Sequence, residues 1–334
     1  MTGRRSLVAC LLLCGLATGM TGRSTPASPR ALRDASVWPF APDDPWNVPL
    51  GSGATFDSAQ VLKTAQWINY TQYSISVYYA SRSDPWRTVR TSGGDSPRDA
   101  TVRMPPSAQG AVGTDLSLVV ISPDRRFSDE WWQFDRGTHA GTAGDPYRAG
   151  KYLHVDLRKH AFLGPMRGAG TSFLGGLIRP RDIAAHSIRH VLAFASHGSD
   201  LQDLGNPADA GPNPVRPPPG SGPCPIWPAV RCDGAQEAGL LAIPPGVPKP
   251  AGLSPLGSAI WDALQHYGAY DVDNAGANVF YAQDQQSDPR DAAAIAAATR
   301  DMPTVQAAMR WVTNNSQSHP GGPGARLAPL APGF

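Results

Sequence analysis

Lysine and glutamate are scarce in this chain of 334 residues. Of its 29 basic residues only four are lysines, and of its 27 acidic residues only Glu130 and Glu237 are glutamates. The opposite charges nearly cancel, to a formal net charge of +2 at pH 7. A chain without a strong field of either sign has little attraction to nucleic acid or to an anionic membrane surface, so we expect neither as a partner.

Sequence motifs of several enzyme classes are missing too. The chain has no glycine-rich nucleotide loop between a strand and a helix, no Gly-x-Ser-x-Gly elbow and no His-Glu-x-x-His pair. His186 and His190 have the spacing of two metal ligands on a helix, but no third ligand lies nearby in the sequence. We therefore expect neither a cofactor nor a metal ion.

Long apolar runs are absent except at the N-terminus. Residues Leu7 to Met20 form an apolar run behind the basic pair Arg4-Arg5. A run of about 14 residues is too short to cross a bilayer, but it has the length of the apolar part of a signal peptide. We therefore predict a signal peptide over residues 1–27, export to the periplasm or the extracellular space, and no transmembrane segment.

Cysteine is rare as well. The chain has four cysteines, and cleavage of the signal peptide would remove Cys10 and Cys14. Cys224 and Cys232 remain, close together in a proline-rich segment. Two neighbouring cysteines in an exported protein favour a disulfide, whereas a metal site would need more cysteines or histidines at matching spacing. We predict a disulfide between Cys224 and Cys232.

Glycine and proline are abundant, with 35 and 34 residues, which favours turns over long helices. The clearest hairpin pattern covers residues 116–134. Other expected elements are a helix over 57–69, a buried strand over 189–194, a helix that begins at Ser254-Pro255, a second hairpin over 269–282, and helices over 291–299 and 304–313. This pattern predicts a mostly β fold, an antiparallel β-sandwich or jelly-roll-like core with a few packed helices. We expect one monomeric domain over residues 28–313 and a flexible tail over 314–334.

Acidic and aromatic residues meet in the segment Asp129–Asp135. Enzymes that cleave polysaccharides place carboxylates beside tryptophans, because the rings stack on sugars while a carboxyl group transfers a proton. Here Glu130 would be the catalytic acid or base, and Trp131 and Trp132 would bind the sugar. The alternative is a structural hairpin whose tryptophans fill the core and whose acids face water.

Two more residues are candidates for contact with a substrate. Trp46 belongs to an irregular segment rich in aromatic and acidic residues, which suits the lip of a sugar site. Asp233 follows Cys232, where a disulfide would hold its carboxylate at the rim of a pocket. Each also has a structural alternative, since Trp46 can fill the core and Asp233 can belong to a simple turn.

The segment Tyr147–His154 is similar to the alginate lyase signature, which reads aromatic, Lys, Ala, Gly, any, Tyr, any, Gln. Arg148 replaces the Lys and His154 replaces the Gln. The matching tyrosine of that family is the acid that protonates the leaving oxygen, so the resemblance implies this role for Tyr152. The likeness covers eight residues, and the other motifs of the family are not matched. The alternative is an ordinary core strand with polar ends.

A glycine-rich turn and an apolar strand flank His190 in the stretch Gly168–Phe194. A histidine at the mouth of an apolar strand suits a base or a donor that orients a substrate. The segments SFLGGLIRPRDI and IRHVLAF of this stretch, together with PWN, WPA and YGAYDVD elsewhere, resemble a group of secreted bacterial proteins without a well-defined function. The resemblance covers most of residues 40–285 and implies export and a single domain, but no activity.

Together these features predict a secreted protein that acts on an extracellular polysaccharide. It would be a glycoside hydrolase or a polysaccharide lyase with carboxylate, histidine or tyrosine acid–base chemistry. The alternative is a non-catalytic glycan-binding protein or one associated with the cell envelope. If the protein is an enzyme of this kind, Glu130, Tyr152, His154 and His190 should converge on one cavity.

Overall fold

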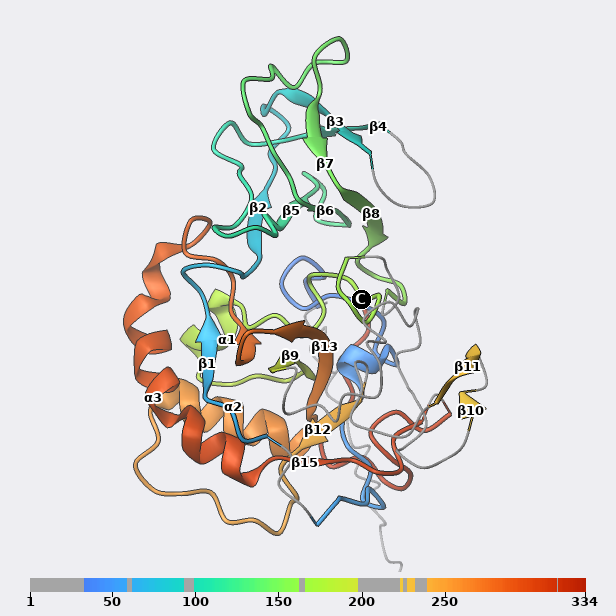
Figure 1. The fold of residues 1–334 in the computed structure, drawn as a ribbon, viewed down its shortest axis with the longest axis vertical. Helices are drawn as coiled ribbons and strands as arrows, with labels where there is room; N and C mark the ends of the chain where they lie inside the picture. The colour runs from blue at the N-terminus through green and yellow to red at the C-terminus, as the bar shows by residue number, and fades with distance from the viewer. Residues whose placement is uncertain are drawn as a thin grey trace, which may run out of the picture. The chain divides into compact units, whose positions relative to one another are not determined.

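The largest sheet is built from strands that lie far apart in the sequence (Figure 1). The structure is a computed structural model that describes residues 33–58, 62–92, 99–161, 166–197, 239–316 and 318–334, and the backbone of two short strands, β10 (Pro223–Cys224) and β11 (Trp227–Arg231). The six strands of the largest sheet are, in spatial order, β1 (Gln66–Asn69), β14 (Asn278–Tyr281), β9 (Leu192–His197), β13 (Ala269–Ala275), β12 (Leu240–Ala242) and β15 (Arg310–Trp311).

Two smaller sheets are formed by the residues between β1 and β9 (Figure 1). The four-stranded sheet has the order β2 (Ser76–Tyr79), β5 (Leu118–Ile121), β6 (Phe127–Trp132) and β8 (Lys151–Asp156). The three-stranded sheet has the order β4 (Asp99–Arg103), β3 (Trp86–Thr91) and β7 (Tyr147–Ala149). β5 and β6 pair in antiparallel fashion, so the expected hairpin over 116–134 is confirmed.

Helices are few. They are α1 (Pro180–Ala185), α2 (Pro255–His266), α3 (Ala292–Ala308) and the 3₁₀ turns η1 (Pro45–Asn47) and η2 (Pro289–Asp291). The expected start of α2 is confirmed, because the Ser254 hydroxyl accepts a hydrogen bond from the Gly257 amide at 3.1 Å and caps the first turn. The two helices expected over 291–299 and 304–313 are one helix, α3, with Pro303 inside it. No helix among the described residues is long and apolar enough to span a membrane.

The fold is therefore mostly β with a few packed helices, as expected. The sheets are mixed, however, and not wholly antiparallel. Strand pairs β1–β14, β9–β13, β2–β5 and β3–β7 are parallel. The expected hairpin over 269–282 is wrong, because β9 lies between β13 and β14 and pairs with both. The helix expected over 57–69 is also wrong, since Gln66–Asn69 is a strand paired with β14.

The C-terminal residues do not form the expected flexible tail. The Gly51 amide donates to the Gly321 carbonyl at 2.9 Å, and the Leu327 amide donates to the Leu50 carbonyl at 2.8 Å. Arg326 donates to the carbonyl of Pro49 at 3.0 Å. Residues 318–334 therefore belong to the same compact unit as the rest of the described chain.

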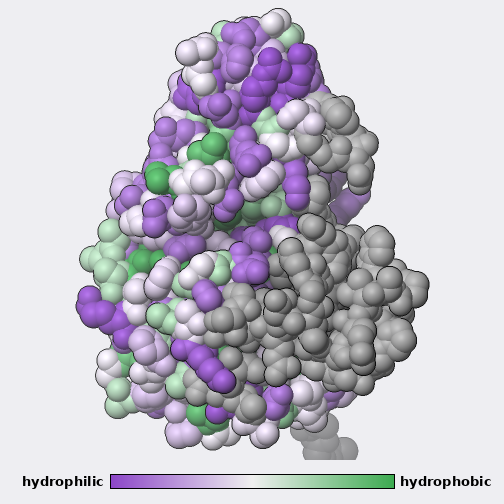
Figure 2. All heavy atoms as spheres, viewed as in Figure 1, coloured by the Kyte–Doolittle hydropathy of each residue, from purple (hydrophilic) through white to green (hydrophobic). Residues whose placement is uncertain are grey.

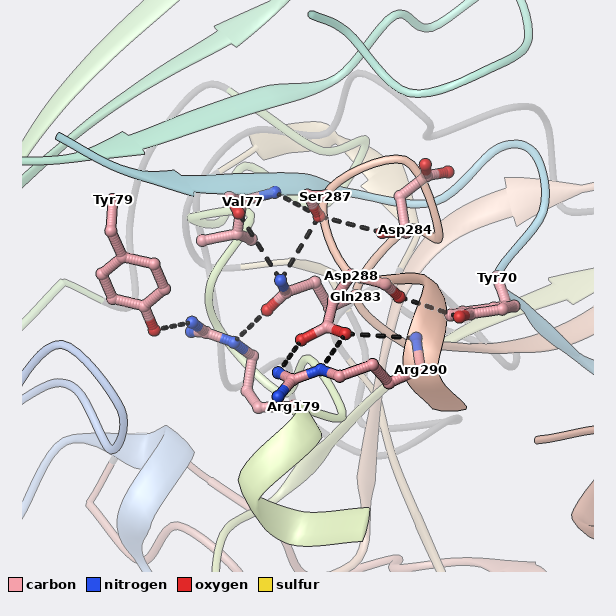
Figure 3. Close-up of polar contacts among 9 residues, drawn as sticks. All are labelled: Tyr70, Val77, Tyr79, Arg179, Gln283, Asp284, Ser287, Asp288 and Arg290. Carbon is pink, nitrogen blue, oxygen red and sulfur yellow. Dashed lines mark hydrogen bonds and ion pairs between the residues drawn. The ribbon is translucent and has the colours of Figure 1, made fainter. Parts of the chain in front are cut away.

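A polar network fastens β2 to the turn that follows β14 (Figure 3). Arg179 donates to the side chain of Gln283 at 3.0 Å and to the Tyr79 hydroxyl at 2.7 Å. The Ser287 hydroxyl in turn accepts a hydrogen bond from the Val77 amide at 3.1 Å. These bonds therefore connect the four-stranded sheet to the end of β14 in the six-stranded sheet.

The stretch Gly168–Phe194 crosses the centre of the core. Its apolar run brings Gly175 and Gly176 against the fully buried ring of Trp46. A Cβ atom on Gly176 would lie 2.2 Å from the Ala193 backbone nitrogen, and Gly176 has a φ of +67°. The position therefore requires glycine for both space and backbone conformation.

Replacement of Gly176 by alanine is expected to lower the free energy of unfolding by about 3 kcal/mol or more, because the added methyl group meets backbone that cannot move aside. Urea denaturation of the purified protein measures this change. The control is Gly246→Ala, where a Cβ meets no atom within 4 Å and little change is expected. Equal effects of the two substitutions would contradict the packing argument.

Candidate active site

A cavity of about 730 Å³ lies between the six-stranded and the four-stranded sheets. Strands β1, β13 and β14 supply one wall, and β6 and β8 with the residues before β5 supply the other. The side chains with polar or aromatic groups on these walls include Trp67, Asn69, Gln72, Tyr73, Asp115, Ser117, Trp132, Lys151, Arg167, Asp273, Asn274 and Tyr281. We refer to this cavity as the inter-sheet cleft.

Two carboxyl groups face the inter-sheet cleft, Asp115 and Asp273. Desolvation raises the pKa of Asp273 to about 6; the charge of Arg167 opposes this shift, and the charge of Asp115 adds to it. The Gly168 amide donates to Asp273 at 3.3 Å. Asp273 can therefore hold a proton in mildly acidic water, where an ordinary aspartic acid would be ionised.

A β-bulge sets the position of Asp273. The register between β13 and β9 shifts between Asp271 and Asp273, so Val272 is an extra residue in β13. Bulges bend a strand and redirect its side chains. Asp271 is fully buried and accepts two hydrogen bonds from Ser196, at 2.6 and 3.2 Å, whereas Asp273 lines the cleft.

Arg167 is the buried cation beside these acids. Its guanidinium donates to the Phe173 carbonyl at 3.1 Å and lies 4.3 Å from the centre of the Tyr281 ring. Burial raises the pKa of Tyr281 above its ordinary value, so this tyrosine remains a neutral hydroxyl. Arg167 thus places a positive charge beside Asp273.

Three aromatic side chains line the cleft with part of their rings in contact with solvent. Trp67 is 43% exposed and Tyr73 is 42% exposed. The Trp132 ring is partly buried, its indole nitrogen lies 3.4 Å from an Asp115 oxygen, and the Lys151 ammonium lies 5.3 Å from its centre. Exposed rings beside acids are the usual lining of a sugar-binding cleft.

The backbone around the cleft is strained at three points. Tyr73, Leu116 and Gln133 have φ angles of 52°, 44° and 54°. Residues other than glycine rarely adopt this left-handed backbone conformation. Tyr73 itself lines the cleft, Leu116 follows Asp115, and Gln133 follows Trp132. Strain of this kind persists where surrounding structure enforces it, and it tends to occur at functional sites.

Glu130, the acid or base expected from the sequence, does not reach the cleft. Its side chain is fully buried and accepts hydrogen bonds from the Ser172 hydroxyl at 2.7 Å, the Phe173 amide at 2.7 Å and the Ser128 hydroxyl at 3.2 Å. Burial raises the pKa of Glu130 to about 7, against the effect of these donors. Its contacts fasten β6 to the loop before Leu174, so the role that they indicate is structural.

Tyr152 and His154 point to the opposite face of the four-stranded sheet. The register pairs Asp129 with His154 and Trp131 with Tyr152. Asp129 accepts a hydrogen bond from the Tyr152 hydroxyl at 2.6 Å, and its oxygen lies 2.8 Å from the His154 Nδ1 atom. Side chains alternate between faces along a strand, so Glu130 and this cluster cannot share a cavity. Trp131 is fully buried beside Tyr152, with 5.5 Å between ring centres, and cannot bind a sugar.

His190 and Trp46 also lie away from the cleft. His190 is held by Asp182, with 3.3 Å between Nε2 and the carboxylate. Burial lowers the pKa of His190, but the hydrogen bond and charge of Asp182 outweigh it, so the net shift is upward. Trp46 is buried against Gly175 and Tyr270. The expected convergence of Glu130, Tyr152, His154 and His190 is therefore wrong.

The remaining predictions fall on residues that the structure does not describe. Cys232 and Asp233 lie outside the described residues, and only the backbone of Cys224 is described. The predicted disulfide and the predicted role of Asp233 therefore stay predictions, as do the signal peptide and its cleavage.

Of the described residues that were expected to bind substrate, Trp132 alone lines the inter-sheet cleft. Sequence reasoning missed Asp115, Arg167 and Asp273, and it placed Trp67 in a helix. A weak signal was present for Asp273, which ends a β-pattern just before a turn at Ala275-Gly276.

Among the described residues, no three or more His, Cys, Asp or Glu side chains are grouped so that they could hold a metal ion. Comparisons of the chain with protein-family models, with curated proteins and with solved structures found no match.

Proposed function

We propose that this protein is an exported glycoside hydrolase that acts on an extracellular polysaccharide in the inter-sheet cleft. One observation carries the proposal: two carboxyl groups, Asp115 and Asp273, line the same cavity as three partly exposed aromatic rings. Hydrolysis of a glycosidic bond requires a pair of carboxyl groups, one to donate a proton and one to act from the other side of the sugar.

Asp273 is the proton donor in this proposal. With a pKa of about 6 it keeps its proton at mildly acidic pH and can deliver it to the oxygen that leaves the sugar. Asp273 must donate its proton and then regain one in each catalytic cycle. A pKa close to the working pH allows both the donation and the recovery of the proton. Asp115 acts as the carboxylate that attacks the sugar or activates water, and its charge helps to keep Asp273 protonated.

The aromatic rings hold the sugar. A pyranose ring presents an apolar face of C–H groups that packs well on an aromatic ring. Trp67 and Tyr73 come from β1 and from the chain just after it, while Trp132 comes from β6 on the other wall. A sugar between the walls would contact rings on both sides while its glycosidic oxygen faces the acids.

A panel of neutral and acidic polysaccharides tests the proposal. Purified protein is expected to release new reducing ends from at least one of them. Products that carry an unsaturated uronate, detected by their ultraviolet absorbance, would identify a lyase instead. Binding without any turnover across the panel would favour the non-catalytic glycan-binding alternative and overturn the hydrolase proposal.

Replacement of Trp67 by alanine is expected to raise the KM for the polysaccharide roughly tenfold, because the sugar loses a stacking surface worth about 1–2 kcal/mol. The value of kcat should change much less, since Trp67 donates no proton. Steady-state kinetics measure both quantities. Leu330→Ala, which removes an exposed apolar side chain outside the cleft, is the control and should leave KM unchanged.

A further inference from the structure

A second cavity lies on the other face of the four-stranded sheet. It has a volume of about 560 Å³ and is bounded by β3 and β4, by the turn between β5 and β6, and by β6 and β8. Asp129 and His154 reach it from one face of the β6–β8 pair, whereas Trp132 and Lys151 reach the inter-sheet cleft from the opposite face. The two cavities are therefore distinct.

Two guanidinium groups line this cavity, those of Arg82 and Arg103. Among the described residues, no carboxylate lies within 4.0 Å of either group. Arg103 donates to the Asp84 carbonyl at 2.7 Å, which fixes its position without neutralising its charge. Hydrophilic side chains gather at the end of the molecule that carries β3 and β4 (Figure 2). The two guanidinium groups thus offer positively charged hydrogen-bond donors to an anion at their side of the cavity.

An exposed tryptophan stands beside these cations. Trp86 is 57% exposed, the largest exposed fraction among the large apolar side chains described. It pairs with Arg103 across β3 and β4, and the guanidinium lies 4.4 Å from the centre of its ring. An exposed ring beside a fixed cation offers a stacking surface and a positive charge together, which suits a ligand that has an apolar face and an anionic group.

The floor of the cavity is preorganised. The Asp129 carboxylate is bound by the Tyr152 hydroxyl at 2.6 Å and contacts His154 at 2.8 Å, and the His154 ring stacks on Phe127 with 5.1 Å between centres. These donors partly compensate the negative charge of Asp129, so it repels an anion less than an isolated carboxylate would. The wall residue Asp124 is likewise occupied, by the Ser122 hydroxyl at 2.6 Å.

We propose that this second cavity binds an anionic sugar residue, a uronate unit of a glycan. The pyranose ring packs on Trp86, and its carboxylate accepts hydrogen bonds from Arg82 and Arg103. The Tyr152 and His154 side chains lie at the floor beneath the sugar. This binding site is separate from the inter-sheet cleft, and the inference does not depend on hydrolysis there.

Calorimetric titration with trigalacturonate tests this inference. The wild-type protein is expected to bind it with an affinity that falls as ionic strength rises, because exposed charge pairs are screened by salt. Trp86→Ala and Arg103→Gln are each expected to weaken binding about tenfold or more. Trp86→Phe should restore most of the affinity lost in Trp86→Ala, and circular dichroism checks that each variant is folded.

Three further arms distinguish uronate binding in the second cavity from binding in the inter-sheet cleft and from attraction to charge or ring alone. Trp67→Ala, which removes a stacking surface of the inter-sheet cleft, should leave the affinity for trigalacturonate unchanged, because Trp67 does not line the second cavity. A neutral trisaccharide, maltotriose, should bind at least tenfold more weakly. Benzoate, which offers a ring and a carboxylate but no sugar hydroxyls, should also bind more weakly. Equal binding of either probe, or full affinity in both Trp86→Ala and Arg103→Gln, would overturn the proposal.

Discussion

Replacement of Asp273 by asparagine is expected to lower kcat by about 10²–10⁴-fold, the usual contribution of a positioned proton donor. Asparagine keeps the size of the side chain and can still accept the hydrogen bond from the Gly168 amide. It cannot deliver a proton to the leaving oxygen. The KM should change little, because the aromatic rings proposed to bind the sugar are untouched. Reducing-end assays with the best polysaccharide of the panel measure both constants.

The pH dependence gives a second and independent signature of Asp273. The acid is active only while protonated, so kcat should fall as pH rises through about 6. Asp115 adds to the raised pKa of Asp273 through its charge. The variant Asp115→Asn removes that charge, so the fall of its residual activity should move to lower pH. The two variants should therefore differ in profile as well as in rate.

The matched control for both variants is Asp262→Asn. Asp262 lies on the exposed side of α2 and pairs with Lys249 at 2.7 Å, outside the inter-sheet cleft. It should retain wild-type kcat and the wild-type pH profile. If Asp273→Asn retained wild-type kcat, Asp273 would not be the proton donor and the proposed mechanism would be wrong.

Replacement of Glu130 by glutamine is expected to stabilise the protein at and above pH 7 and to change its stability little at low pH. The folded state raises the pKa of Glu130 from 4.5 to about 7. Between pH 4.5 and about 7, Glu130 therefore holds a proton in the folded protein that it has released in the unfolded chain. The stability associated with that proton is complete below pH 4.5 and is lost as pH rises through about 7.

The size of the effect follows from the shift in pKa. Each unit corresponds to about 1.4 kcal/mol, so the loss of stability between pH 4.5 and 7 is about 3 kcal/mol for Glu130. Glutamine resembles the protonated acid: its oxygen can accept from the Phe173 amide and its NH₂ group can donate to the Ser172 hydroxyl. The stability curves of wild type and Glu130→Gln should therefore meet at low pH and separate as pH rises.

Urea denaturation at a series of pH values measures these curves. Asp271→Asn is the matched comparison, because burial also raises the pKa of Asp271 to about 7 and its donors come from Ser196. Each single variant should remove part of the pH dependence, and the double variant should remove more. A constant difference between wild type and Glu130→Gln at all pH values would show that the folded state keeps Glu130 ionised.

The same variant also decides between a structural and a catalytic role for Glu130. Because Glu130 is fully buried, Glu130→Gln should retain kcat within a few fold. Glu130→Ala should instead lose about 3 kcal/mol or more of stability, since it leaves buried donors unsatisfied and opens a cavity. A loss of kcat by about 10²-fold in folded Glu130→Gln would return Glu130 to the catalytic role that its sequence neighbours suggest.

The sequence by itself determined features that depend on neighbours in the chain. The hairpin over 116–134 follows from two apolar runs around a turn, and the start of α2 follows from Ser254 as a cap before Pro255. Side chains alternate along β6, so neighbours such as Asp129 and Glu130 lie on opposite faces of the sheet. The mostly β character of the fold could be predicted because it is the sum of many local strand and turn patterns.

Tertiary structure decided which of these elements meet. Gln66–Asn69 is a strand only because β14 pairs with it, and β9 separates β13 from β14 although no local signal indicates this. The surroundings of each β6 side chain also depend on distant residues: Ser172 and Phe173 enclose Glu130. A carboxylate beside two tryptophans looks the same in the sequence whether it faces a cleft or the core.

The candidate site is also a feature that only the tertiary structure decided. Asp115 and Asp273 lie in distant parts of the chain, and neither stands in a motif that marks it as an acid. Their interaction arises because the two sheets approach each other, and the raised pKa of Asp273 arises from the desolvation that this approach causes. Composition and periodicity can predict strands and an apolar core, but the pairing of two distant carboxyl groups is a property of the folded chain alone.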